Sequence, residues 1–144
     1  MKNIKAFTML DMMLSITILV MVFALSLPFY QSFQFQQELD TATMYTVQAI
    51  RVAQVNSRVM NQDDQWGMKI QNGSITLFKG SSYASRNTIY DSLYSISQQI
   101  AVSGVNEVVF TKFYGETTNT GTITLTHSNK SRNISVNSKG TVNY

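Results

Sequence analysis

The sequence is poor in the residue types that most often build reactive sites. Its 144 residues include no cysteine, one histidine and one proline. Without cysteine the chain can form neither disulfides nor thiolate metal sites. Charged residues make up 13% of the chain, about half the usual share. The formal net charge of +3 is too small to indicate a protein built mainly to bind nucleic acid.

What the sequence has instead is a concentration of apolar residues near its start. From Met12 to Leu27 it is apolar apart from Ser15, Thr17 and Ser26, whose hydroxyls can hydrogen-bond back to a helix carbonyl. The stretch from Phe7 to Leu27 has the length of about 20 residues that crosses a hydrocarbon core as a helix. The pattern predicts one membrane-spanning helix.

Basic residues flank this stretch on one side only. Lys2 and Lys5 precede it, and the next basic residue is Arg51. Because positive charge stays on the cytoplasmic side of a membrane, the N-terminus is expected in the cytoplasm and the bulk of the chain outside.

Two ordinary interpretations of the segment are open. It could be a signal anchor, or a secretory signal that is cleaved near Ala24-Leu25-Ser26. Neither explains Asp11, because a carboxylate inside a bilayer costs roughly 2.5 to 3.5 kcal/mol and usually has a partner there.

The stretch Ala6-Phe7-Thr8-Met9-Leu10-Asp11 resembles the cleavage and methylation motif of type IV prepilins and type II secretion pseudopilins. The resemblance implies a leader of residues 1–6, cut after Ala6, and a mature chain that begins at Phe7 with Asp11 as the acid of the motif. Pro28 also lies at the spacing from Phe7 where these proteins commonly carry a proline. The chain departs from the usual pattern in having Ala6 in place of Gly and Asp11 in place of Glu.

The resemblance also implies roles for these residues. A prepilin peptidase would cut after Ala6 on the cytoplasmic side and methylate the new amine of Phe7. Asp11 would then pair with the amine of a neighbouring subunit in a filament. A low-dielectric setting strengthens such a pair and makes either charge alone costly. Phe7, Asp11 and Pro28 are therefore the expected subunit-assembly residues.

The helix is expected to continue past the membrane, from about Thr8 to Met60, and to end at Asn61-Gln62-Asp63-Asp64. We expect Pro28 to kink or loosen it; the alternative is that Pro28 ends the membrane helix. Helical spacing predicts a buried stripe in the second half, consisting of Phe35, Leu39, Ala42, Ala49 and Ala53, broadened by Val52, Val55 and Val59.

Downstream, the apolar period changes from helical to two. Residues 66–70 and 74–78, joined by Asn72-Gly73, predict a β-hairpin. Residues 80–87 are expected to form a loop, and 88–102 short strands and turns. Residues 105–114, 120–127 and 131–137 predict three more strands, with a short one at 141–144.

The helix stretch Ala49-Ile50-Arg51-Val52-Ala53, the pair Trp66-Gly67 and the run from Gly121 to Asn143 resemble minor pseudopilins of the GspH/FimT type. This implies an α+β, pilin-like fold with a long N-terminal helix, transmembrane in its first half, packed on a C-terminal antiparallel β-sheet domain of two sheets. The expected organisation is residues 1–6 as leader, 7–30 as membrane segment, 31–62 as the soluble half of the helix and 63–144 as the β-rich domain.

The residues offer little for catalysis or cofactor binding. His127 is expected as an exposed turn residue, without a nucleophile to activate. Asp63 and Asp64 could hold a hard cation, but a solvated turn is the simpler interpretation. We expect no enzyme activity and no cofactor.

One nucleic-acid hypothesis is open. Lys130, Arg132 and Lys139 lie close in sequence and are candidate DNA contacts through phosphates. The alternative is a solvated sheet edge.

Together these patterns predict a minor pilin or pseudopilin of the cytoplasmic (inner) membrane, later part of a pilus or a type II secretion pseudopilus. Its expected partners are other pilin subunits, the prepilin peptidase, the inner-membrane assembly platform and membrane lipid. The alternative is a secreted or membrane-anchored β-rich binding domain with an ordinary signal segment.

Overall fold

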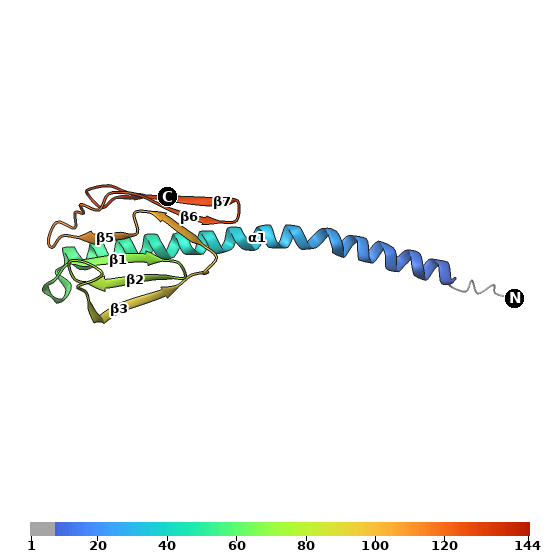
Figure 1. Cartoon of the computed structure of the whole chain (residues 1–144), viewed down its shortest axis with the longest axis horizontal. Helices are drawn as coiled ribbons and strands as arrows, with labels where there is room; N and C mark the ends of the chain where they lie inside the picture. The colour runs from blue at the N-terminus through green and yellow to red at the C-terminus, as the bar shows by residue number, and fades with distance from the viewer. Residues whose placement is uncertain (1–7) are drawn as a thin grey trace. The chain divides into compact units, whose positions relative to one another are not determined.

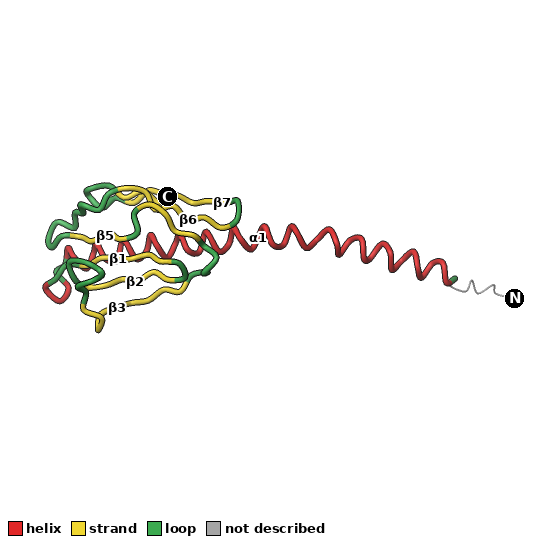
Figure 2. Tube along the Cα trace, viewed as in Figure 1, coloured by secondary structure: helices red, strands yellow, loops and turns green. Residues whose placement is uncertain are grey.

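The computed structural model of the protein describes residues 8–144, and the side chains of all of these except residues 26–29. It has an α+β arrangement, in which one long helix, α1 (Met9–Arg58), precedes an antiparallel β region (Figure 1; Figure 2). A short 3-10 turn, η1 (Asn61–Asp63), follows the helix. The strands are β1 (Trp66–Gln71), β2 (Ser74–Lys79), β3 (Asn87–Ser95), β4 (Ala101–Gly104), β5 (Glu107–Phe110), β6 (Gly121–His127), β7 (Lys130–Val136) and β8 (Val142–Asn143).

The helix confirms the predicted single element closely. It contains 50 residues and continues through Pro28, so the alternative that Pro28 ends the helix is wrong. The kink expected at Pro28 stays a prediction. The helix ends where expected: Met60 takes a left-handed backbone conformation (φ 52°) and Trp66 Nε1 donates a hydrogen bond to Asn61 O at 2.8 Å.

The chain divides into two compact units, Met1–Gln34 and Phe35–Tyr144. We call the second unit the head. It contains the second half of α1 together with all the strands, so the helix supplies part of the head's core. The expected boundary at residue 30 lies close to this division.

Two four-stranded antiparallel sheets build the head, one in the order β3-β2-β1-β5 and the other in the order β4-β6-β7-β8. The chain passes from β3 in the first sheet to β4 in the second, returns to β5 in the first, and then forms β6 to β8 in the second. These crossings tie the two sheets together.

The predicted hairpin is confirmed. Gln71 pairs with Ser74, which leaves Asn72 and Gly73 as the connection, and Gly73 has a φ of 86°. Gly67 matters for packing, because a β-carbon there would lie 2.7 Å from the ring of Phe78 and 2.8 Å from Val108 O.

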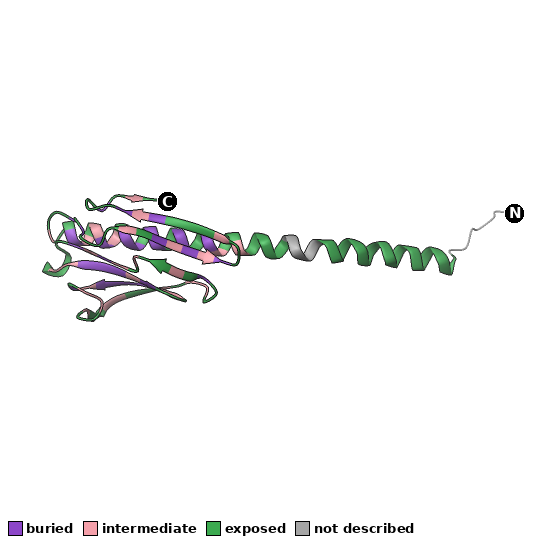
Figure 3. Cartoon of the chain, turned by 45° about the horizontal axis from the view of Figure 1, so that its top comes forward, coloured by how far each residue is buried: buried purple, intermediate pink, exposed green. Residues whose placement is uncertain are grey.

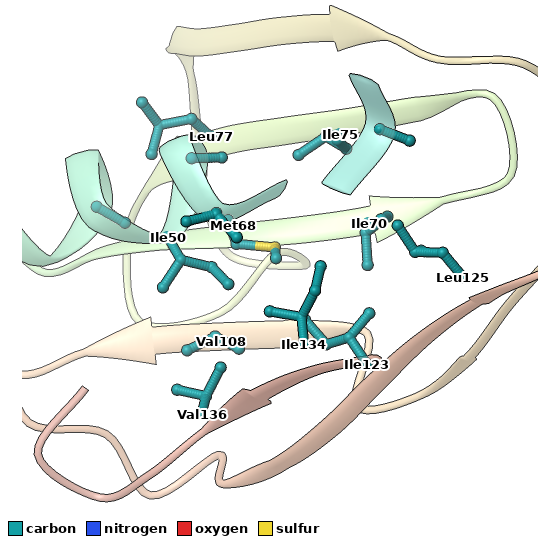
Figure 4. Packing of buried hydrophobic residues seen from close by; sticks show 14 of the residues in the cluster. Ile50, Met68, Ile70, Ile75, Leu77, Val108, Ile123, Leu125, Ile134 and Val136 are labelled. Carbon is teal, nitrogen blue, oxygen red and sulfur yellow. The ribbon is translucent and has the colours of Figure 1, made fainter. Parts of the chain in front are cut away.

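A single core joins the helix to both sheets. Its fully buried members include Ile50 of α1, Met68 and Val108 of the first sheet, and Ile123 and Ile134 of the second (Figure 4). Because the helix and the two sheets bury their apolar faces against one another, the stability of the head depends on all three.

The predicted stripe on the second half of α1 is largely confirmed. Leu39, Ala42, Ala49 and Ala53 are at most 1% exposed. Buried residues recur along the second half of α1 (Figure 3). Phe35 and Val52 are half-buried. Val55 and Val59 are 55% and 65% exposed, so including them was wrong. The stripe instead follows Val47, Ile50 and Ser57, on the side that faces the strands.

The strand expected at residues 105–114 is shorter than predicted, because β5 ends at Phe110. After it, Thr111 N donates to Glu116 O at 2.9 Å, and Phe113 has a φ of 67°. These residues form a turn that returns the chain toward α1, where Phe113 N donates to Ser57 O.

Candidate functional site

Asp11, the expected assembly residue, closes the first turn of α1. Its Oδ2 accepts hydrogen bonds from Thr8 N at 3.1 Å and from Thr8 Oγ1 at 2.8 Å, and Asp11 N donates to Thr8 Oγ1 at 3.3 Å. This reciprocal pattern is a capping box, which satisfies the free N–H groups at a helix start. Ala6 and Phe7, the expected processing residues, lie outside the described residues.

The first part of α1 presents its apolar side chains to the surroundings. Between Met9 and Leu25 the large hydrophobic side chains are 55% to 82% exposed. By length and composition α1 could cross a membrane. Two of the three predicted hydroxyls bond back to the helix: Ser15 Oγ donates to Asp11 O and Thr17 Oγ1 to Met13 O, both at 2.7 Å. The side chain of Ser26, the third, lies outside the described ones.

Because the hydroxyls of Ser15 and Thr17 are satisfied within their own helix, these two residues do not oppose an apolar environment. Pro28, the third assembly residue, lies within the same helix, and its side chain is outside the described ones.

His127 is buried, and its prediction as an exposed turn residue was wrong. It ends β6 at 4% exposure and stacks on Phe35 with ring centroids 4.4 Å apart. Its Nε2 lies 3.2 Å from Gln99 Oε1 and 3.3 Å from Glu38 Oε2. The alternation of β6 could have predicted this burial, since Ile123, Leu125 and His127 lie on the same, inward face of the strand.

The three candidate DNA contacts are not gathered at one place. Lys130 begins β7, whereas Lys139 follows the end of that strand, and a seven-residue strand spans about 20 Å. Arg132, between them, forms an ion pair with Asp40 of α1 at 2.9 Å. DNA contact by this set stays an untested prediction.

The acidic pair after the helix is engaged locally. Asp63 forms an ion pair with Lys112 at 3.2 Å, and Asp64 Oδ1 accepts a hydrogen bond from Gln65 N at 2.8 Å. Within residues 8–144, no three His, Cys, Asp or Glu side chains converge in a way that could hold a metal ion.

Two features escaped the sequence interpretation. The Thr8-x-x-Asp11 spacing is a readable capping-box pattern, and it gives Asp11 a partner within its own chain. Arg51 and Arg58 are seven residues apart, hence on one side of α1, where Lys139 joins them around a pocket of about 300 Å³.

We compared the chain with family models, with curated proteins and with solved structures, and none of them matches it.

Proposed function

We propose that the protein is a minor pilin or pseudopilin, a structural subunit of a type IV pilus or a type II secretion pseudopilus with no catalytic activity of its own. It would be inserted in the cytoplasmic membrane with its N-terminus inside, trimmed after Ala6, and assembled through its N-terminal helix. The assembled subunit would lie outside the membrane. The proposal rests on the prepilin-type motif at residues 6–11 together with the form of α1.

The observation that carries the proposal is the unequal burial along one continuous helix. The large apolar side chains from Met9 to Leu25 are exposed, whereas Leu39, Ile50 and Ala53 are fully buried in the head. A helix that is apolar all round requires lipid or other apolar helices as its surroundings. A pilin-type subunit would meet both surroundings in turn: lipid while it is held in the membrane, and neighbouring apolar helices once it is assembled in a filament.

Asp11 has two roles in this proposal. Within one chain it caps the helix by accepting hydrogen bonds from Thr8. In a filament its carboxylate would also meet the Phe7 amine of an adjoining subunit. In an apolar setting that attraction is much stronger than in water, so it would fix the axial offset between subunits.

The partners that follow from this mechanism are other pilin or pseudopilin subunits, the prepilin peptidase, the inner-membrane assembly platform and membrane lipid. The head would provide the surface displayed by the assembled subunit.

Intact mass of the membrane-extracted protein tests the processing step. We expect the loss of Met1–Ala6 and the gain of one methyl group. A mature chain that begins near Leu27 would identify a secretory signal, and an untrimmed chain a plain anchor. Either result would replace the proposal with a secreted or anchored binding domain.

Substitution of Asp11 separates its two roles. Both substitutions remove the hydrogen bond from Thr8 Oγ1 to Asp11 Oδ2. Asp11→Ala also removes the acid and with it the proposed intersubunit pair, whereas Thr8→Ala leaves the acid and its bond from Thr8 N. We expect both variants to insert and to be cleaved, and only Asp11→Ala to lose most of its incorporation into filaments, measured by immunoblot of sheared filaments. Equal losses in the two variants would reduce Asp11 to a capping residue.

A further inference from the structure

A row of pockets lies between α1 and the edge of the second sheet. It consists of three adjacent pockets of about 300, 280 and 380 Å³. Arg51 lines the first and the second, and Met44 and Tyr144 line the second and the third. We call this feature the α1–β8 groove. It lies wholly within the head.

One end of the groove holds three cations. Arg51, Arg58 and Lys139 all line its first pocket, and no acidic residue lines that pocket. Among the residues that the structure describes, none of these three forms an ion pair, whereas Lys69, Arg86, Lys112 and Arg132 are each paired with a carboxylate.

The contacts of Arg51 and Arg58 do not neutralise their charges, because neither contact is with a carboxylate. Arg58 Nε donates to the carbonyl of Tyr114 at 3.2 Å, and Arg51 lies 5.8 Å from the ring centre of Tyr144. Like charges held around one hollow repel each other, so an anionic ligand would be favoured there.

The middle of the groove is apolar. Met44 and Tyr144 are 68% and 67% exposed along it, and Val47 lies beneath them. The far end is different again, because the ion pair of Asp40 and Arg132 lines it.

The wall of the groove opposite α1 includes an edge strand. β8 is the last strand in its sheet, and Val142 lines the first pocket. Asn137 and Thr141 are a hydrogen-bonded pair, since Asn137 N donates to Thr141 O at 3.2 Å, and the next residues, Val136 and Val142, lie opposite each other. In an antiparallel ladder the direction of the backbone groups alternates, so the N–H and C=O of Val142 face away from β7.

We propose that the α1–β8 groove binds an extended, acidic segment of a partner protein. The backbone of the segment pairs with Val142, as in the addition of a strand to a sheet edge. Its carboxylates meet Arg51, Arg58 and Lys139, and an apolar side chain covers Met44 and Val47. The inference goes beyond the proposed function and holds whether or not the chain is a filament subunit.

The far end of the groove favours a peptide over a nucleic acid. A nucleic acid carries a phosphate at every residue. One that followed the groove would bring phosphates to the Asp40 carboxylate, where Arg132, which lines the same pocket, is already paired with Asp40. A peptide can place its acids at the cationic end and apolar or neutral residues along the rest.

Binding of a fluorescent peptide with a Glu-Val repeat in one half and only Val and Ser in the other, to the full chain in non-ionic detergent, tests the proposal. The double variant Arg51→Gln, Lys139→Gln removes two cations whose side chains make no hydrogen bond or ion pair in the described structure. We expect it to weaken binding about tenfold or more. Lys79→Gln, a cation on β2 that lies over the Tyr90 ring, is the matched control and should change the Kd less than about twofold.

Two changes of the probe complete the test. A peptide of the same sequence with alternate backbone nitrogens methylated should bind more weakly, because it cannot pair with Val142. No binding of the Glu-Val peptide, or an unchanged Kd in the double variant, would overturn the proposal. So would tighter binding of an oligothymidylate that the double variant also weakens, because the groove would then be a nucleic-acid site.

Discussion

The two halves of α1 are built from similar apolar residues and have opposite surroundings. Ile16 and Ile18 in the first half are 56% and 55% exposed, whereas Ile50 in the second half is fully buried. The first half is apolar on every side. The second half carries an apolar stripe with Asp40, Gln48 and Arg51 on its other side. Burial therefore follows from the pattern around the helix, because a one-sided stripe fits a sheet and an all-round apolar surface fits lipid or neighbouring helices.

The difference between the two halves is tested most directly by truncating an isoleucine side chain in each half. Ile50→Ala should lower the free energy of unfolding of the head by about 2 to 5 kcal/mol, because it leaves a cavity among helix and sheets. The free energy is measured by chemical denaturation in non-ionic detergent, with the fluorescence of the buried Trp66 as the signal of unfolding. Ile18→Ala is the matched control and should leave the head unchanged; equal effects would contradict the division of the helix.

A smaller effect is expected from the polar link between the helix and the first sheet. Ser57 Oγ is buried, accepts from Trp66 N at 3.0 Å and donates to Phe110 O at 3.2 Å. Ser57→Ala leaves these backbone groups without that partner and should lower the free energy of unfolding by about 1 to 3 kcal/mol. Ser103→Ala, at an exposed serine of β4, should have almost no effect in the same assay. A stable Ser57→Ala variant would show that the head does not depend on this link.

The smallest effect is expected on the exposed side of the same helix. Asp40 and Arg132 join α1 to β7, with side chains 54% and 43% exposed. Asp40→Asn should lower the free energy of unfolding by less than about 1 kcal/mol, and the difference should shrink as salt is added. A larger, salt-independent loss would mean that the pair does more than join two exposed charges.

The sequence was most informative where one local rule decides the structure. The helix, the Asn72-Gly73 hairpin and the strands β6 and β7 were all predicted near their observed bounds. It was less informative where neighbours distant in sequence decide. His127 was placed at the surface, although Phe35, Glu38 and Gln99 from other segments enclose it.

The candidate site divides in the same way. Asp11 stood out because a carboxylate in an apolar run is costly, and Pro28 because it is the only proline. The meeting of Arg51 and Arg58 with Lys139 could not be predicted, because Lys139 comes from the connection between β7 and β8. No local pattern states which face of a helix a distant turn will reach.

By itself the sequence determined the apolar first half of the helix, the stripe of small residues in the second and the alternation of the strands, since each is a periodicity written into neighbouring residues. Only the tertiary structure decided which strands pair in each of the two sheets, that the chain crosses between the sheets, and that a cationic groove lies beside β8. Those outcomes depend on long-range packing around one core, where the contacts that choose among arrangements are made by residues far apart along the chain.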